Sequence, residues 1–396
     1  MNKYAAMILA GVLSLCGAAS AQANFSQTAP EVPDNGKEIP VKALAVPKTN
    51  LEIYGLLDEY AGYTDAAGTG SQFKLDSGGW QATRLGFRGS SEINDKVKIT
   101  YTLENGFYSY SGGLNDTTRL FNRQAWFGVA GKFGEFRVGR ENSPLFDMLG
   151  SIDSFSGATF GSFLNNASGY TPRFDDMLSY RSPVMKGWRL QAHTSIAGIN
   201  SKYSKSADVL NAYIGSVDYN SKDNKVYFVS NYQQQVAADR SFSVRSSFTG
   251  ASYDYGRGKV YAGYFHGNSP QAGVGDFSSA NVAEKVVKGP YWDLYSFSGN
   301  YRLTRKFRVG AGWGWGSAEN GPRAASHEPS VIGAYDFAKW GMIWGTAGRM
   351  VNEGNADFGL GAAGPITKNL PATGKDVTGV QLGIRFNFSA KLIKPN

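Results

Sequence analysis

Apolar and polar residues alternate along most of this chain, most clearly in the segment 378–388 near its end. Every second residue there is Thr or apolar, and the residues between them are small, polar or charged. A strand points successive side chains to opposite faces, so this segment has one apolar and one polar face. The apolar faces are rich in aromatics and the polar faces carry arginines, which is typical of a transmembrane barrel with lipid outside and water inside.

The same alternation predicts about sixteen strands. Short turns, such as Asn94-Asp95 and Gly131-Lys132, alternate with longer loops. Outer-membrane barrels have short turns at one end and long loops at the other, and a barrel of this size leaves an aqueous channel. We therefore predict an all-β fold, a sixteen-stranded antiparallel transmembrane β-barrel over residues 50–388. The expected strands lie near 50–63, 79–92, 96–108, 119–130, 133–140, 174–182, 187–197, 208–219, 225–233, 246–256, 259–267, 291–302, 306–317, 330–337, 340–350 and 377–388.

Charged residues fix which face of each strand meets lipid. Lys98 and Glu104 share one face of the expected strand 96–108, and Arg84 and Arg88 share one face of the strand before it. A Lys or Arg at the bilayer midplane costs about 2–4 kcal/mol. We therefore expect these four side chains to point into the lumen, and the alternating apolar side chains to face lipid.

The N-terminus has the pattern of a secretory signal peptide over residues 1–23. Lys3 precedes an apolar stretch, and Ala21-Gln22-Ala23 forms a cleavage site. A membrane anchor is the weaker interpretation, because the stretch is shorter than the roughly 20 residues that a spanning helix needs. Cys16, the only cysteine, lies inside this segment, so the mature chain has no disulfide, thiolate metal site or Cys nucleophile.

Residues 24–49 form a Pro-rich, polar extension without periodicity, which predicts a disordered or periplasmic segment. After the signal there is no apolar run long enough for a spanning helix. The net charge of +8 comes without a basic cluster or recognition helix, which argues against nucleic acid as a partner. A basic lumen would attract anions, although the total charge does not say where the charges lie.

One long loop, between Arg140 and Arg173, lacks strand alternation. It follows the fifth expected strand and contains Pro144, Asp147 and Asp153. Long loops without secondary structure are usually functional, so we expect this loop to matter for the channel.

Several short motifs point to a known family when they are taken together. They are Leu51-Glu52-Ile53-Tyr54-Gly55, Thr83-Arg84-Leu85-Gly86-Phe87-Arg88-Gly89, Leu103-Glu104-Asn105-Gly106-Phe107, Asn122-Arg123-Gln124-Ala125-Trp126-Phe127-Gly128, Val138-Gly139-Arg140-Glu141-Asn142-Ser143-Pro144, Tyr180-Arg181-Ser182-Pro183 and the segment 379–388. With these motifs the chain resembles the Gram-negative general porins, above all the beta-proteobacterial type. Each motif is weak alone, but together they span nearly the whole mature chain.

The resemblance implies a homotrimer of sixteen-stranded barrels whose third outer loop folds into each pore. It also implies a ladder of basic wall residues, matched here by Arg84, Arg123 and Arg173, facing acids of the loop, for which Asp147 and Asp153 are the candidates. The other expected lumen residues are Asp58, Arg88, Lys98, Glu104 and Arg140. Opposed charges across such an aperture remain partly unscreened, because the Debye length is about 8 Å at physiological salt.

The resemblance further implies insertion into the outer membrane from the periplasm. The expected partners are outer-membrane lipid including lipopolysaccharide, the barrel-assembly machinery, and small hydrophilic solutes. In this family a terminal Phe is the assembly signal, and Phe388 matches it. The chain departs from the pattern in two ways: the tail 389–396 follows Phe388, and the extension 24–49 precedes the first strand.

An enzyme is the poorer interpretation. His193, His266 and His327 are the only histidines, and no Ser lies in a recognised nucleophile context. We expect no catalytic site, no cofactor and no clustered metal ligands, although Ca²⁺ on loop carboxylates is left open.

We therefore expect a passive porin with a possible preference for anions. Two alternatives remain open: a channel selective for sugars or organic acids, and a structural or adhesive barrel without a channel, suggested by the Pro-rich extension.

Overall fold

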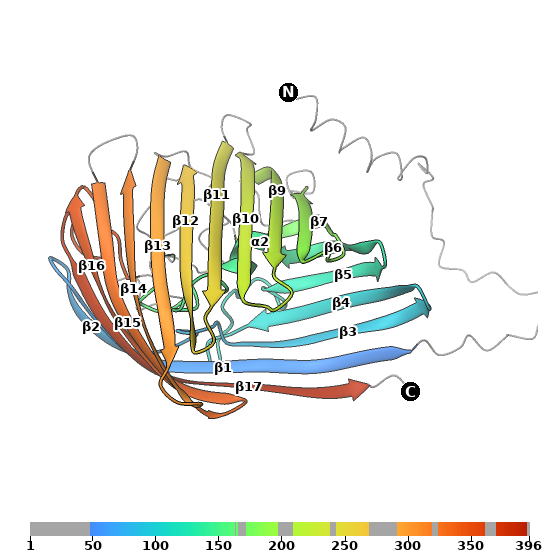
Figure 1. The fold of residues 1–396 in the computed structure, drawn as a ribbon, viewed down its shortest axis with the longest axis horizontal. Helices are drawn as coiled ribbons and strands as arrows, with labels where there is room; N and C mark the ends of the chain where they lie inside the picture. The colour runs from blue at the N-terminus through green and yellow to red at the C-terminus, as the bar shows by residue number, and fades with distance from the viewer. Residues whose placement is uncertain are drawn as a thin grey trace, which may run out of the picture. The chain divides into compact units, whose positions relative to one another are not determined.

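The computed structural model describes residues 48–162, 164, 172–196, 209–237, 243–268, 291–318, 324–360 and 370–393. The predicted signal peptide and residues 24–47 of the predicted extension lie outside this range. The described residues form one antiparallel sheet and the short helix α2 (Figure 1). The elements are β1 (Thr49–Ala66), β2 (Gly70–Ser77), β3 (Arg84–Asn94), β4 (Val97–Gly106), β5 (Gln124–Gly131), β6 (Gly134–Asn142), α2 (Pro144–Leu149), β7 (Arg173–Arg181), β8 (Trp188–Ser195), β9 (Val209–Asn220), β10 (Val226–Ala237), β11 (Ser243–Asp254), β12 (Gly258–Asn268), β13 (Tyr291–Arg302), β14 (Phe307–Ala318), β15 (Ala324–Ala338), β16 (Gly341–Gly354) and β17 (Val377–Ile393).

The sheet closes on itself through β1 and β17, which lie side by side in Figure 1. On its other edge β1 pairs with two strands in turn, with Ser77 of β2 opposite Glu59 and Arg84 of β3 opposite Leu56. β2 and β3 are thus two halves of one interrupted strand. The result is a closed, sixteen-stranded antiparallel barrel, which confirms the predicted fold class.

The predicted facing of the strands is confirmed on the last strand. Leu382 is 64% exposed on the outer face, whereas its neighbour Gln381 is 4% exposed on the inner face. Trp313 and Phe297 are likewise exposed on the outside of β14 and β13. In the absence of lipid these exposed apolar side chains mark the surface that a bilayer would cover.

Several strand bounds differ from the predicted ones. β2 was not expected at all, and the strand expected over 79–92 begins only at Arg84. β15 begins at Ala324 rather than near 330. β17 continues through the first five residues of the predicted tail to Ile393, because β1 offers unpaired backbone groups as far as Leu51.

Phe388 consequently lies inside β17 rather than at its end. Its ring lies directly over Gly55 of β1, where any Cβ would collide with it. Phe388 stays the predicted assembly aromatic, but its strand extends five residues further than predicted.

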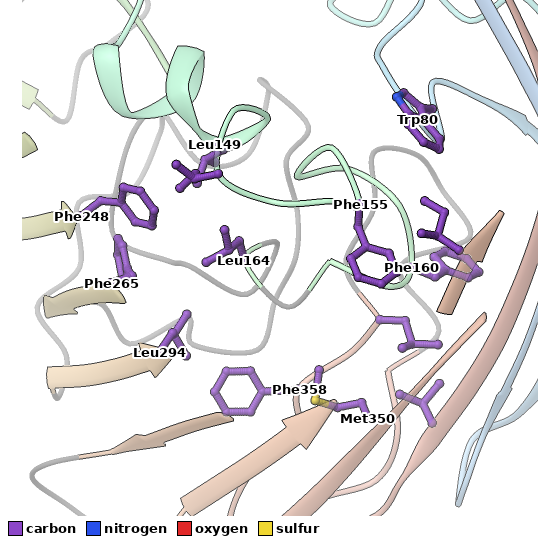
Figure 2. Close-up of a cluster of buried hydrophobic side chains, with 14 of the residues drawn as sticks. Trp80, Leu149, Phe155, Phe160, Leu164, Phe248, Phe265, Leu294, Met350 and Phe358 are labelled. Carbon is purple, nitrogen blue, oxygen red and sulfur yellow. The ribbon is translucent and has the colours of Figure 1, made fainter. Parts of the chain in front are cut away.

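The long loop after β6 begins with α2. The Ser143 hydroxyl accepts a hydrogen bond from the Phe146 N–H, and Pro144 occupies the first turn, so the start of the helix is capped. The apolar side chains of the loop then pack on the inner face of the barrel, where Figure 2 shows Leu164 beside Phe248, Phe265 and Leu294, and Phe155 and Phe160 together on the side of Trp80. This cluster joins the loop to β1, β10–β13 and β15–β17.

Hydrogen bonds hold the same loop against the wall. The Phe160 N–H donates to Gln381 Oε1 at 2.8 Å, and the Ser154 N–H donates to Ser298 Oγ at 3.0 Å. The Ser330 hydroxyl donates to the Gly161 carbonyl at 2.8 Å. These bonds satisfy backbone groups that the packed loop removes from water.

Two wall glycines make room for the loop. A Cβ on Gly312 would lie 2.5 Å from the Phe155 ring, and one on Gly379 would lie 2.9 Å from Phe160. Within the segment 312–316, where glycines alternate with tryptophans, Gly312 thus faces inward against the loop while Trp313 and Trp315 point outward.

Within the part of the chain that the structure describes, no helix has the length and apolar character needed to cross a membrane.

Candidate functional site

A cavity of about 330 Å³ lies between the barrel wall and the loop that follows β6. Its charged lining residues are Arg84, Arg123, Arg173, Glu104 and Asp147. Three arginines against two carboxylates give this lining a formal charge of +1. The structure thus places together all three wall arginines and one of the two loop acids that the family motifs indicated.

Glu104 organises two of these arginines. Its carboxylate lies 2.7 Å from Arg123 Nε and 3.6 Å from Arg84 Nε, and it accepts a hydrogen bond of 2.9 Å from the Tyr54 hydroxyl. The Arg123 N–H also donates to the Glu104 carbonyl. Because the carboxylate holds both guanidinium groups, it fixes where their charge meets the cavity.

Arg173 is placed differently. It is the first residue of β7, it is 4% exposed, and its guanidinium carbon lies 4.5 Å above the Phe146 ring of α2. Within the described residues its Nε and Nη2 have no hydrogen-bond partner. The positive charge of Arg173 is therefore less compensated than the charges of Arg84 and Arg123.

Asp147 lies on the loop side of the cavity, in α2. Its Oδ1 accepts a hydrogen bond of 2.7 Å from Asn142 Nδ2, and its Oδ2 is 3.8 Å from Arg181 Nη2. The carboxylate therefore ties the helix to β6 and β7 while it also borders the cavity. Arg181 was not among the predicted lumen residues.

The prediction for Asp153 needs correction, because this residue does not line the arginine cavity. It is 4% exposed and accepts hydrogen bonds from the Phe155 and Gly157 N–H groups, at 3.2 Å each, and from the Ser162 and Ser298 hydroxyls. Burial raises the pKa of Asp153, and these hydrogen bonds oppose that rise. Asp153 organises the loop rather than facing the arginines.

Arg140 also lies outside the arginine cavity. Its Nη1 is 2.6 Å from Asp175 Oδ1, and its Nε donates to the Asn122 carbonyl at 2.7 Å. Arg119 joins the same Asp175 at 2.7 Å. This network braces the loop between β4 and β5 against β7, so the expected lumen role of Arg140 is replaced by a structural one.

Asp58 is a buried anchor rather than a lumen acid. It is 0% exposed, and its Oδ2 accepts hydrogen bonds of 2.7 Å from the N–H groups of both Trp80 and Gln81. Its Oδ1 accepts a third, of 3.1 Å, from Trp344 Nε1. The carboxylate, which belongs to β1, thus holds the segment between β2 and β3 and also binds Trp344 of β16.

Arg88 and Lys98 lie outside the cavity, toward the end of the barrel that carries the short turns. Arg88 pairs with Glu52 at 2.9 Å and its side chain is 54% exposed. Lys98 is exposed and lies opposite Glu92 in the β3–β4 pair. Arg88 lies on the same face of β3 as Arg84, and Lys98 lies on the same face of β4 as Glu104. Neither Arg88 nor Lys98 borders the arginine cavity.

A second cavity, of about 280 Å³, lies on the turn side of the loop. Trp80, Gly150 and Ser156 line both cavities, so they mark the junction between the two. Lys259, Arg302 and Arg308 add three cations to the second lining. Trp80 and Arg308 were not predicted from their local patterns, although two glycines just before Trp80 interrupt the strand alternation and Arg308 alternates with apolar neighbours.

No group of three or more His, Cys, Asp or Glu side chains that could hold a metal ion occurs among the residues described by the structure.

Comparison with known proteins decides the family. A family model of Gram-negative porins matches residues 5–355. The chain belongs to the Gram-negative porin family. This porin is 26% identical to the outer membrane porin protein 32 of Delftia acidovorans over 357 residues, which cover 87% of this chain and 95% of the relative.

Solved structures agree on the fold. The anion-selective porin from Comamonas acidovorans superposes with a TM-score of 0.70 at 20% identity, over 86% of this porin and 100% of the other chain. The trimer form of OmpT from Vibrio cholerae gives a TM-score of 0.60 at 15% identity, over 86% and 99% of the two chains. The family and the barrel together make this porin a channel of the bacterial outer membrane.

Proposed function

We propose that this porin conducts small hydrophilic solutes by passive diffusion, that it prefers anions, and that Arg84, Arg123 and Arg173 set the preference. The observation that carries this proposal is the cavity in which three arginines meet only two carboxylates. Arginine stays charged at any physiological pH, and charged rings at a narrow point of a channel set its ion preference. The related porin from Comamonas acidovorans is described as anion-selective, which agrees with this proposal.

The loop that begins at Ser143 is the proposed constriction. Its apolar side chains pack on the inner faces of β1, β10–β13 and β15–β17, which leaves open space along the wall where the arginines lie. Asp147 is the proposed acid on the loop side, and the arginines form the basic side. The resulting field lies across the passage, and it favours solutes that carry charge or a dipole.

The proposed assembly is a homotrimer in the outer membrane, in contact with lipid including lipopolysaccharide. OmpT of Vibrio cholerae has been solved as a trimer. Exposed outward aromatics such as Trp313, Trp315 and Phe127 offer the apolar surface that lipid or a neighbouring barrel would cover. We also propose that the barrel-assembly machinery reads β17, which carries Phe388.

The proposed role includes no catalysis. His193 is 4% exposed, and neither of its ring nitrogens has a hydrogen-bond partner among the described residues. A buried ring without such a partner lacks the pairing with a nucleophile that marks a nucleophilic site.

Single-channel recording in a planar bilayer tests the proposal, with the reversal potential measured across a KCl gradient. The native porin should give large ohmic current steps. Its reversal potential should have the sign of a channel that is more permeable to chloride than to potassium. Arg173→Gln should move the potential toward cations, whereas Arg349→Gln, at an outer-face arginine that pairs with Asp376, should leave it unchanged. Silent insertion of folded protein would contradict the channel, and a cation-side potential would contradict the preference.

A further inference from the structure

The segment between β2 and β3 carries Trp80 into the barrel interior, and its position is closely fixed. Asp58 accepts the N–H groups of Trp80 and Gln81, and a Cβ on Gly79 would lie 2.6 Å from Tyr60 and 2.7 Å from Trp344. The Trp80 and Trp344 rings pack edge to face, with centroids 5.8 Å apart. The indole is therefore held in one place, at the junction of the two cavities.

Two guanidinium groups lie beside this indole. The Arg308 guanidinium carbon is 5.5 Å from the centroid of the Trp80 ring, and that of Arg385 is 5.9 Å away. Arg385 Nη1 donates to Gln81 Oε1, and its buried Nε has no hydrogen-bond partner among the described residues. Arg308 Nη1 is 2.8 Å from Asp336 Oδ2, and its Nη2 donates to a weak acceptor, Sδ of Met342.

The second cavity places these groups around one space. Trp80 and Tyr261 contribute aromatic surface to its lining, and Arg308, Lys259 and Arg302 contribute positive charge. The acids of the lining are Asp254, which lies 3.9 Å from Lys259, and Asp153, which is engaged by the loop's own donors. The lining thus combines two aromatic side chains with an excess of cations.

We propose that this cavity is a binding subsite for aromatic carboxylates, in which the ring packs against Trp80 and Tyr261 and the carboxylate meets Arg308. A guanidinium fork binds a carboxylate through two parallel hydrogen bonds, and a planar ring gains contact area from a fixed indole. The subsite rests on the proposed channel function, because a solute reaches it from the lumen of an open pore. A volume of about 280 Å³ accommodates a single-ring acid.

This ligand class follows from the combination of the two features. Inorganic anions and aliphatic acids would use the cations but leave the aromatic surface unused. Neutral sugars would use the aromatic surface, but they bring no charge to the excess of cations. An aromatic carboxylate uses both parts of the lining, so we expect it to remain longest.

The test uses single-channel recording of the full mature porin with three acids of increasing fit: acetate, cyclohexanecarboxylate and benzoate. Each acid is added on the side of the short turns, and its blocking constant is read from the interruptions of the current. Benzoate should block at a concentration about tenfold lower than cyclohexanecarboxylate, and acetate should block least. Tenfold corresponds to a difference of about 1.4 kcal/mol.

Substitutions at two positions locate the block. Trp80→Leu should remove the preference for benzoate over cyclohexanecarboxylate, and Trp80→Phe should restore part of it. Arg308→Gln should weaken the block by both cyclic acids. Trp313→Leu, which removes an outward-facing indole, is the matched control and should change neither constant. Heat-resistant migration in gels shows that each variant is folded.

Several outcomes would overturn the subsite while leaving the channel intact. Equal block by all three acids would mean that the cavity binds any anion. Block by benzoate that responds to Arg84→Gln but not to Trp80→Leu or Arg308→Gln would place the binding in the arginine cavity. Failure of the channel itself is separate, because it would appear as missing ohmic steps before any acid is added.

Discussion

The carboxylate of Asp58 accepts a hydrogen bond of 2.7 Å from the backbone N–H of Trp80, across the interruption between β2 and β3. The interrupted half-strands leave backbone donors without a sheet partner, and the carboxylate supplies the acceptor that the sheet lacks. The anchor thus sets both the path of the segment 78–83 and the position of the indole.

Asp58→Ala should therefore loosen this segment. Each buried donor left without an acceptor costs about 1–3 kcal/mol, and three donors converge on this carboxylate. We expect a lower thermal unfolding temperature and noisier open-channel current. Asp65→Ala, on the exposed end of β1, is the control and should have little effect. Unchanged stability and a quiet current in Asp58→Ala would show that the anchor is dispensable.

Glu104→Gln tests the balance of charge in the arginine cavity. The change removes one of the two carboxylates of the lining while it keeps the shape of the side chain. The reversal potential should move further to the anion side, and the shift should be smaller at high salt because free ions screen the cavity. Glu52 pairs with Arg88 outside this cavity, so Glu52→Gln should shift the reversal potential less.

The stability of the loop should depend on pH through the carboxyl group of Asp153. Burial raises the pKa of Asp153 above its value in an unfolded chain, so the packed loop favours the protonated carboxyl. The contribution of this group to loop stability is fully present below about pH 3.9, the ordinary pKa of Asp, and it is lost as pH rises through the folded pKa. We expect fewer transient loop openings in acid than at neutral pH, measured as current fluctuations. Asp153→Asn should lack this change with pH, and the same pH response in that variant would assign it to other groups.

Glu328 on β15 is a buried carboxyl whose replacement should stabilise the barrel. It is 0% exposed, and neither carboxyl oxygen has a hydrogen-bond partner among the described residues. A buried polar group without a partner costs about 1–3 kcal/mol, so Glu328→Leu should raise the unfolding temperature. Glu135→Gln breaks the ion pair with Arg137 and should lower it. A lower unfolding temperature in Glu328→Leu would mean that the carboxyl has a stabilising partner.

The barrel could be predicted from the sequence because its strands follow a local rule. In β17 the polarity of each residue indicates the face on which it lies, and Leu382 and Gln381 occupy the predicted faces. β2 was missed because it is short and follows a glycine-rich turn, although Phe73 and Leu75 do alternate with polar residues. Local patterns thus predict most of the strands, but they do not predict where every strand begins and ends.

The site was predictable only in part, since its geometry depends on contacts between distant residues. The family motifs predicted that Arg84, Arg123 and Arg173 lie at one site, and all three line one cavity. No local pattern in the sequence shows that Arg140 pairs with Asp175. The turn around Asp153 carried a usable signal, because Asp often accepts a hydrogen bond from the N–H two residues on.

The apolar packing of the loop on β1, β10–β13 and β15–β17 divides the inner surface of the barrel into a dry half and a wet half, and the wet half borders the two cavities. Inner positions on the dry half, such as Phe248 and Phe265, are constrained like the core of a water-soluble domain, and a large-to-small change there should cost about 3–5 kcal/mol. Inner positions on the wet half are constrained by charge rather than by volume. An engineer who wishes to change what this channel admits therefore has freedom at the inner positions that border the two cavities, and diversity within the family should accumulate there first.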